Sequence, residues 1–463
     1  MDRRRFLQGT AATVAALTLG GPPARAAMSD VRVFVNGPIH TMTARGRVSA
    51  LAILGDTIVA VDDPARALLK LGARRVDLDG RALFPGFVDA HSHWFGDYWN
   101  FGFGNPEWAS VASEYEGVWK AAESGWTSIT EHFASPERVQ ALQDVDNDLD
   151  LPVRISAYLP ANFRFDIFDS WYLNFTPGAQ LTPRVRVAGV KFYVDGGLTF
   201  LLREPFNVCH TWPQPPDATE PDPTFTGEWF WDDDVLQARL VEADRAGFQI
   251  TVHCSGDAAT DRMLDQLAAV DPTFDNPRRH NLTHLILLHD EQIARLRRQG
   301  IVANVQLGWF HANERERLEC WLGDRVSMIG RWRDLVRSGV LMTGSTDFPW
   351  GVPIIGSVLR TLYNATTRIG PNGEAPAPWM EAQRITTRQA IALLTRRAAW
   401  ALGEDHRLGT LRRGLQADLT VFTGDPLAVH PTDLLDLDVA ATVVAGEPMH
   451  VLAGHEDLRT ALG

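Results

Sequence analysis

Apolar runs of strand length alternate with amphipathic stretches of helical length through the middle of the chain. Helical patterns over 233–246, 257–270 and 291–299 separate several of these runs. Such alternation is typical of βα units around a parallel sheet, whose buried strands are almost continuously apolar. The runs number eight, enough to close a (β/α)8 TIM barrel of the α/β class: 83–89, 126–131, 152–159, 187–194, 248–253, 282–288, 301–306 and 340–346.

Both ends of the chain have a different hydrophobic pattern, in which short apolar runs are separated by turns. The runs of this kind are 31–35, 50–54, 57–61, 417–422 and 440–444. Neither end shows long helical periodicity, so we predict one small β-sandwich domain assembled from both chain ends. The predicted boundaries are 27–82 together with 404–463 for this domain, and 83–403 for the barrel.

Residues 1–26 have the pattern of an export signal. Residues 3–7 (Arg-Arg-Arg-Phe-Leu) precede a mild apolar stretch over 11–19, and Ala-Arg-Ala follows at 24–26. This order is typical of a twin-arginine signal peptide. The apolar stretch is shorter than the roughly 20 residues that a membrane span needs. We therefore expect export by the twin-arginine machinery to the periplasm or the medium, without stable membrane insertion.

Composition narrows the classes of partner. The chain has 463 residues, is 45% hydrophobic and 22% charged, and carries a formal net charge of -13. These values are ordinary for a globular protein with a large core. No long basic run follows the first residues, which argues against nucleic acid or an anionic membrane as the main partner. A small-molecule substrate is expected, and assembly into a homo-oligomer is left open.

The cysteines Cys209, Cys254 and Cys320 are odd in number and widely spaced. The sequence therefore predicts no disulfide framework. Cys254 follows a histidine in a predicted strand, and consecutive strand residues point to opposite faces. We expect Cys254 to point away from that histidine's partners.

Residues able to bind metal come at the carboxyl ends of apolar runs, and in a parallel barrel those ends meet at one mouth. His91 and His93 share a strand face, so two imidazoles can hold one cation. Asp347 can bind metal through one oxygen and accept a proton through the other. Taken singly, a histidine could be a buried hydrogen-bonded group and Asp347 a turn residue. The candidate set is His91, His93, Lys191, His253, His284 and Asp347.

Lys191 lies within an apolar strand, where a charged amine is costly unless it is paired or neutral. A buried amine with a depressed pKa can react with carbon dioxide to form a carbamate, whose two oxygens can bridge two cations. The alternative is an ion pair with Asp195 or Asp257. The remaining histidines lack a comparable context and are predicted to lie on the surface or behind the metal-binding groups: His132, His210, His289 and His311.

Five stretches carry a resemblance to a known family, and they occur in its order: 84–93, 189–196, 252–257, 283–284 and 344–349. The chain resembles the amidohydrolase superfamily of urease-like metal-dependent hydrolases over about 31–450. It is most similar to the YtcJ-like branch, which includes N-substituted formamide deformylases.

The resemblance implies two divalent metal ions per chain, expected to be zinc. His91 and His93 would hold the more buried ion beside Asp347. His253 and His284 would hold the second, and carboxylated Lys191 would bridge both.

Three departures from the family pattern concern residues near these positions. Thr283 stands where the family often has Glu, and Cys254-Ser255 stands where Ala-Ile is usual. The stretch Ser345-Thr346-Asp347 is one residue longer than the usual Ser-Asp. The predicted metal ligands are retained, whereas the substrate becomes harder to infer.

The function that the resemblance implies is hydrolysis of a non-peptide, amide-like C–N bond, in which Asp347 carries the proton. Hydrolysis of cyclic amides, esters or lactones by the same centre is the alternative within enzymes. A non-catalytic exported binding protein is the alternative from another class. A barrel glycosidase would need two opposed carboxylates instead. Aromatic residues near the predicted mouth suggest an apolar or aromatic substituent, although core packing would explain about half of them: Trp94, Phe95, Tyr98, Trp99, Trp309, Phe310 and Trp350.

Overall fold

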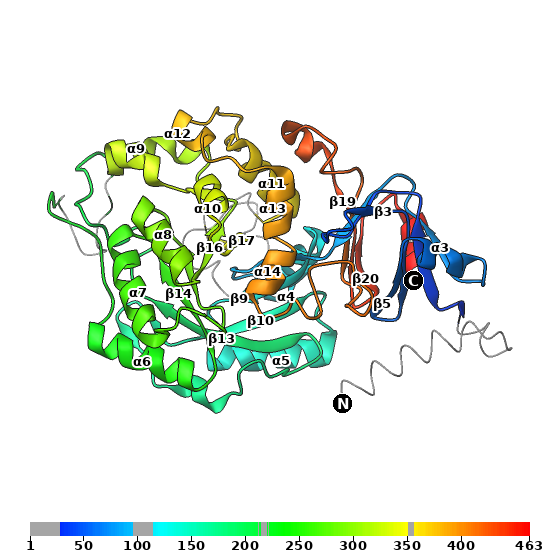
Figure 1. The fold of residues 1–463 in the computed structure, drawn as a ribbon, viewed down its shortest axis with the longest axis horizontal. Helices are drawn as coiled ribbons and strands as arrows, with labels where there is room; N and C mark the ends of the chain where they lie inside the picture. Colours follow the sequence, from blue (N-terminus) through cyan, green and yellow to red (C-terminus); the bar gives the residue numbers. More distant parts are fainter. Residues whose placement is uncertain (1–27, 96–113, 212, 214–219, 221, 351–355) are drawn as a thin grey trace.

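The computed structural model describes residues 28–95, 114–211, 213, 220, 222–350 and 356–463 (Figure 1). The predicted signal peptide, residues 1–26, lies outside this part of the chain. Within it, no helix combines the length and the apolar character that crossing a membrane requires.

The larger part of the structure is an eight-stranded parallel sheet curled into a nearly closed barrel (Figure 1). Every hydrogen-bonded neighbour in the sheet is parallel, and the spatial order is β17-β16-β15-β14-β13-β10-β9-β8. The predicted TIM-barrel class is confirmed. The strands are β8 Phe87–Val88, β9 Trp126–Glu131, β10 Arg154–Pro160, β13 Val185–Tyr193, β14 Gln249–Cys254, β15 Asn281–His284, β16 Val302–Gln306 and β17 Met342–Ser345.

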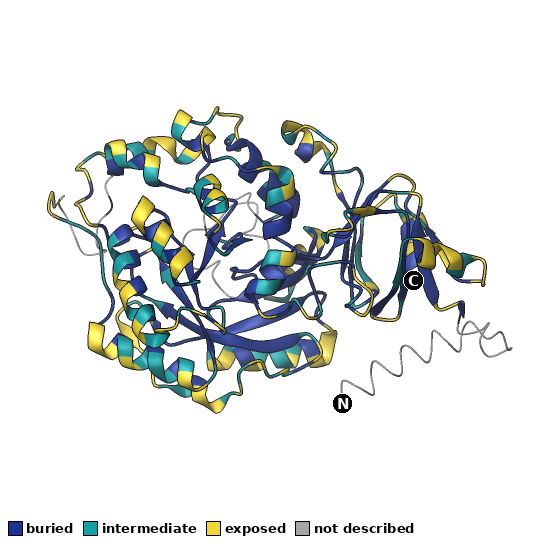
Figure 2. Ribbon diagram, viewed as in Figure 1, coloured by how far each residue is buried: buried dark blue, intermediate teal, exposed yellow. Residues whose placement is uncertain are grey.

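Helices surround this sheet and turn their exposed residues outwards (Figure 2). Local sequence fixes where several of them begin, because a side-chain oxygen accepts from orphan backbone N–H groups. Asp232 does so for α6 and Thr386 for α13. The helices are α4 Glu114–Glu123, α5 Pro136–Leu149, α6 Asp233–Arg245, α7 Asp257–Val270, α8 Asp290–Arg298, α9 Arg315–Leu322, α10 Trp332–Ser338, α11 Val358–Thr367, α12 Pro378–Glu381, α13 Thr387–Leu393 and α14 Arg396–Ala401.

Two further sheets come from the chain ends. A four-stranded sheet has the order β5-β4-β1-β6, and a six-stranded sheet has the order β20-β19-β18-β7-β2-β3. Phe34 and Leu51 of the first share a buried cluster with Leu83 and Val421 of the second, so the sheets pack face to face. The elements are β1 Val31–Val35, β2 Ile39–His40, β3 Arg47–Val48, β4 Leu51–Leu54, β5 Thr57–Val61, α3 Asp63–Leu69, β6 Arg74–Asp77, β7 Ala82–Pro85, β18 Leu419–Phe422, β19 Val439–Val444, β20 Glu447–Val451 and α15 Glu456–Leu462.

The predicted first barrel strand, 83–89, is two strands in the structure. Ala82–Pro85 pairs antiparallel with β18 in the six-stranded sheet, whereas Phe87–Val88 pairs with β9 in the barrel. Gly86 lies between them, and a Cβ there would come within 2.1 Å of Thr127 Oγ1. The chain therefore passes from one sheet to the other at a glycine, which alone allows this close approach.

The predicted strand 282–288 is also shorter than expected, because β15 ends at His284. His284 and Leu285 have φ angles of 79° and 48°, in the left-handed region that side chains other than glycine seldom adopt. The chain turns out of the sheet at these two residues, so the run 285–288 is apolar without being a strand.

Backbone hydrogen bonds join the first and last strands at the carboxyl end of the barrel. Asp347 N donates to His91 O at 2.7 Å, and His93 N donates to Phe348 O at 2.7 Å. Asp89 accepts from Thr346 N at 2.9 Å and from Thr346 Oγ1. The seam of the barrel is thus held by the residues around the candidate metal ligands.

The expectation of no disulfide framework is wrong for two of the three cysteines. Cys209, after β13, and Cys320, in α9, form a disulfide across 111 residues of sequence. Sequence spacing could not indicate this pairing, because the barrel alone brings the two segments together. Cys254 is buried and free, with Sγ 3.7 Å from Thr260 Oγ1 on α7, so it points away from the barrel interior as expected.

Candidate metal centre

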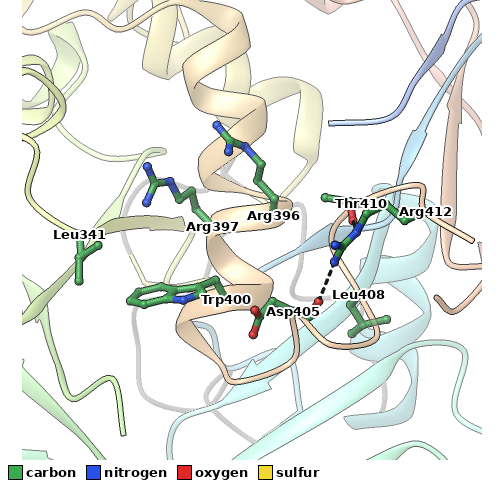
Figure 3. Close-up of a pocket in the computed structure, with 8 residues that line it drawn as sticks. All are labelled: Leu341, Arg396, Arg397, Trp400, Asp405, Leu408, Thr410 and Arg412. Carbon is green, nitrogen blue, oxygen red and sulfur yellow. Dashed lines mark hydrogen bonds between the residues drawn. The ribbon is translucent and has the colours of Figure 1, made fainter. Parts of the chain in front are cut away.

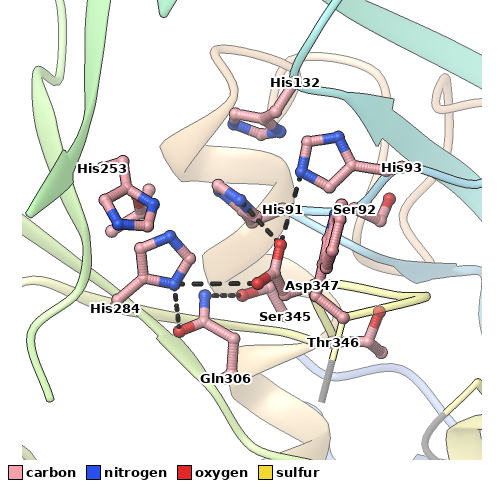
Figure 4. A network of polar contacts seen from close by, with 12 residues as sticks. His91, Ser92, His93, His132, His253, His284, Gln306, Ser345, Thr346 and Asp347 are labelled. Carbon is pink, nitrogen blue, oxygen red and sulfur yellow. Dashed lines mark hydrogen bonds and ion pairs between the residues drawn. The ribbon is translucent and has the colours of Figure 1, made fainter. Parts of the chain in front are cut away.

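Three predicted ligands converge at the mouth of the barrel. His91 and His93 follow β8, and Asp347 follows β17. One ligand atom from each lies within 4.8 Å of those of the other two, and all three side chains are buried. Asp347 Oδ1 is 3.0 Å from His91 Nε2 and 3.4 Å from His93 Nε2 (Figure 4). Two imidazoles and a carboxylate in this arrangement are typical ligands for zinc and similar cations.

His253 and His284 lie beside this group. His253 is on β14 and His284 ends β15, and their ring centroids are 4.2 Å apart. The His284 ring is 4.9 Å from that of His91, and its Nδ1 is 3.9 Å from Asp347 Oδ2. The four imidazoles therefore border one volume together with Asp347 (Figure 4).

Lys191 is fully buried on β13. Its Nζ donates to Thr283 Oγ1 at 3.4 Å and lies 4.9 Å from the centre of the Tyr193 ring. In the described ranges Lys191 forms no ion pair. The two carboxylates considered as its alternative partners contact other groups. Asp195 accepts from backbone N–H groups of the turn after β14, and Asp257 contacts His289.

The electrostatics keep most of these donors in the form that binds metal. Burial lowers the pKa of His91, His253 and His284 well below the ordinary value, and neighbouring basic groups add to the effect. Burial likewise lowers the pKa of Lys191 to about 7. Neutral imidazoles offer a lone pair to a cation, and a neutral amine is a nucleophile.

His93 and Asp347 are coupled and behave differently. Burial opposes protonation of His93, but the hydrogen bonds that its ring donates to the Asp347 and Glu131 carboxylates outweigh burial and raise the pKa of this imidazole. Burial raises the pKa of Asp347, against the opposing contact with His93. A cation placed between these groups would favour the carboxylate and the neutral imidazole.

Unsatisfied buried atoms support the fit of a cation. His91 Nδ1 and His284 Nε2 are buried and have no hydrogen-bond partner among the described residues. Such atoms are rare in folded proteins, because leaving one unpaired costs about 1–3 kcal/mol. Metal coordination would satisfy donors of this chemistry, so the residues present fit a bound divalent ion.

Two groups that the sequence did not single out orient the ligands. Glu131, at the end of β9, has Oε1 3.2 Å from His93 Nδ1. Gln306, at the end of β16, has Oε1 3.0 Å from His284 Nδ1. A partner on the remaining ring nitrogen fixes the direction in which an imidazole points. Both are polar residues at predicted strand ends, and that position is the signal that could have identified them.

His132 lies behind a candidate ligand, which is one of the two positions expected for it. It is fully buried, and its ring stacks on that of His91 at 3.9 Å. Tyr158 stacks on its other face at 4.2 Å. Both ring nitrogens of His132 have no partner in the described part of the chain. His132 directly follows β9, but the sequence alone does not show which side chains lie beside it in the folded barrel.

Comparison with known proteins agrees with this geometry. The model of the amidohydrolase family Amidohydro_3 matches residues 116–450. "Putative amidohydrolase YtcJ" of Bacillus subtilis (strain 168) is 28% identical over 271 residues, covering 57% of this chain and 47% of that protein. N-substituted formamide deformylase of Arthrobacter pascens is 26% identical over 229 residues, covering 48% of this chain and 40% of that protein. The chain thus spans about half or less of the length of the curated relatives that it matches.

The fold comparison covers more of the molecule. An uncharacterized metal-dependent hydrolase from Pyrococcus horikoshii OT3 superposes with a TM-score of 0.69 at 18% identity, over 87% of this chain and 99% of that one. At this identity the likeness concerns the fold. Because the family model covers most of the chain, from β9 of the barrel through the Asp347 segment, the protein belongs to the amidohydrolase family.

Proposed function

We propose that the protein hydrolyses a non-peptide, amide-like C–N bond in a small molecule. The observation that carries the proposal is the convergence of His91, His93 and Asp347 on one buried point, with His253 and His284 adjacent. The similarity to an N-substituted formamide deformylase supports this type of bond.

The proposed cofactor is a pair of divalent ions, zinc in the first instance. His91, His93 and Asp347 would hold one, and His253 and His284 the other. A bound metal of this kind lowers the pKa of water towards neutrality and polarises a carbonyl.

The modification proposed for Lys191 is a carbamate. With a pKa of about 7, roughly half of the amine is uncharged at neutral pH. The neutral Nζ would attack carbon dioxide, form a new C–N bond and release one proton to water. The resulting carboxylate would face the two histidine pairs.

Asp347 is the proposed proton carrier. Its Oδ1 lies between His91 and His93, while its Oδ2 faces His284. Asp347 would accept a proton from the attacking water as the new C–O bond forms. It would then donate that proton to the nitrogen as the C–N bond breaks, so the products are a carboxylic acid and an amine.

An aromatic side chain borders the proposed substrate site. Trp309 is partly exposed and stacks on the His284 ring at 5.4 Å. By contrast, Trp94 and Phe95 are fully buried, and Trp94 stacks on Phe348 at 3.9 Å, so these two pack in the core. Tyr98 and Trp99 lie outside the described residues. Trp309 supports a flat or apolar substituent on the substrate.

We further propose that the protein works outside the cytoplasm after twin-arginine export. The Cys209–Cys320 disulfide supports this location, because disulfides persist in oxidising compartments. Recovery of a periplasmic form that starts near residue 27 would be the expected result. A full-length cytoplasmic form with reduced cysteines would contradict it.

A substrate panel with metal analysis tests the reaction. Protein with bound metal should hydrolyse N-substituted formamides faster than lactones, esters, cyclic amides and dipeptides, and a chelator should abolish turnover. Preference for lactones or cyclic amides would replace the proposed bond type. Metal-replete protein that is inactive on the whole panel would favour a binding protein.

A further inference from the structure

A pocket of about 360 Å³ is lined by residues that include none of the candidate metal ligands (Figure 3). Arg396, Arg397 and Trp400 of α14 form one wall, and the segment after it contributes others. Leu341, which also lines the pocket, immediately precedes β17, whereas Asp347 follows the carboxyl end of the same strand. The pocket is therefore at the end of the barrel opposite to the candidate catalytic site.

The lining has an excess of positive charge. Arg396 and Arg397 make no ion pair in the described ranges. Arg412 donates to Thr410 Oγ1 at 3.1 Å and to the backbone oxygen of Asp405 at 3.5 Å, but to no carboxylate there. Three guanidinium groups thus border one pocket in a chain whose net charge is -13.

The one carboxylate in the lining is already neutralised from outside. Arg279 Nη1 lies 2.7 Å from Asp405 Oδ1, and its guanidinium lies 4.7 Å from the centre of the Trp400 ring. Arg279 is not part of the lining. Asp405 is therefore already paired with an arginine that lies outside the lining.

The charge of Arg396 also affects the pKa of Arg397. Arg397 is half-buried, and burial together with the charge of Arg396 lowers its pKa. A bound oxyanion would relieve this repulsion and accept the planar N–H donors of the guanidinium groups, which match carboxylate and phosphate geometry.

The rest of the lining is apolar. Leu341 and Leu408 contribute aliphatic surface, and Trp400 is partly exposed with its ring in the lining. A volume of this size falls in the range of small-molecule sites. A ligand that suits the pocket therefore combines an anionic head with a small apolar or aromatic body.

We propose that the pocket formed by α14 and the 405–412 segment binds a small organic oxyanion, a phosphate monoester or a carboxylate, at a site separate from the metal centre. This inference does not depend on the proposed reaction, because binding alone tests it.

Calorimetric titration of the metal-loaded protein with phenyl phosphate, benzoate and inorganic phosphate is the direct test. The informative variant is R397Q/R412Q, and the matched control is R388Q/R413Q. Arg388 and Arg413 are exposed, lie outside the pocket and give the same charge change. Each lost charge-assisted contact should weaken binding about tenfold, so the first variant should lose about a hundredfold and the control little. Metal content should be the same in all three proteins.

The outcomes are distinct. Binding that disappears with a chelator and is equal in both double variants would place the anion at the metal centre and overturn the proposal. Equal weakening in both variants would show an effect of net charge alone and overturn it as well. Binding of polyglutamate but of none of the small anions would indicate an acidic macromolecule instead. A preference for phenyl phosphate over inorganic phosphate would support the apolar wall, and the choice between phenyl phosphate and benzoate identifies the head group.

Discussion

His311 should make the folded protein sensitive to acid. It lies in the loop after β16, is buried, and has no hydrogen-bond partner on either ring nitrogen in the described ranges. Burial, reinforced by the charge of Arg368, lowers its pKa from 6.5 to about 4. Glu374 acts in the opposite direction, whereas Arg317 and Arg360 act in the same direction as Arg368.

The sign and size of the effect follow from proton linkage. Between pH 6.5 and about 4 the unfolded chain binds a proton at this histidine that the folded chain does not. The stability that the buried, neutral His311 preserves is therefore fully present above pH 6.5. It decreases as the pH falls towards 4. At about 1.4 kcal/mol per pH unit, the loss across this window is about 3 kcal/mol.

Urea denaturation followed by tryptophan fluorescence, at a series of pH values and with chelator in every sample, measures this contribution. H311Q should have a free energy of unfolding that falls by about 3 kcal/mol less than that of the wild type between neutral pH and pH 4. Replacement of an exposed histidine, H406Q, controls for the loss of a histidine as such. Parallel curves for wild type and H311Q would refute the reasoning, because burial of the imidazole would then have no energetic consequence.

Three changes at the metal centre have distinct expected results. His132→Phe keeps the ring stack on His91 but removes both unpaired nitrogens, so kcat/KM should fall at least about tenfold with metal content unchanged if substrate or water meets those nitrogens; unchanged kinetics would leave His132 a packing group. Lys191→Met should lower both metal content and turnover, and intact mass spectrometry should show one added carbon dioxide in the wild type alone; full activity in the variant would remove the bridging role. Asp347→Asn should reduce kcat by about 10²–10⁴ while metal remains bound, measured by turnover and elemental analysis; persistent turnover would contradict proton transfer by Asp347.

The barrel was predictable because buried parallel strands carry a strong local signal. The predicted run 126–131 coincides with β9, and 248–253 differs from β14 by one residue at each end. The run 83–89 was interpreted as one strand because both halves are buried. An apolar pattern indicates that a residue is buried but not which sheet it belongs to. The change of sheet at Gly86 could therefore not be predicted from the pattern.

The convergence of His91, His93 and Asp347 was predictable for a related reason, because each comes shortly after the carboxyl end of a recognisable strand. His91, His253 and Asp347 stand at strand ends, and parallel topology brings such ends together. Glu131 and Gln306 also stand at strand ends, but which histidine each of them contacts was not predictable. Glu131 and Gln306 act through the orientation of a side chain across a strand boundary, and His132 acts through ring stacking. These contacts depend on tertiary geometry that spacing along the chain does not encode.

The stretch Ser345-Thr346-Asp347 connects the fold with the site. Thr346 donates its backbone N–H and its hydroxyl to buried Asp89, which also accepts from Trp94 Nε1 at 3.3 Å. Thr346 therefore ties the segment after the last strand to the segment after the first. Asp347 follows with a φ of 60°, a left-handed conformation that costs about 1–3 kcal/mol and persists only where neighbours impose it. Its N–H bond to His91 O supplies that constraint, so the same contacts that close the barrel aim the carboxylate at the two imidazoles.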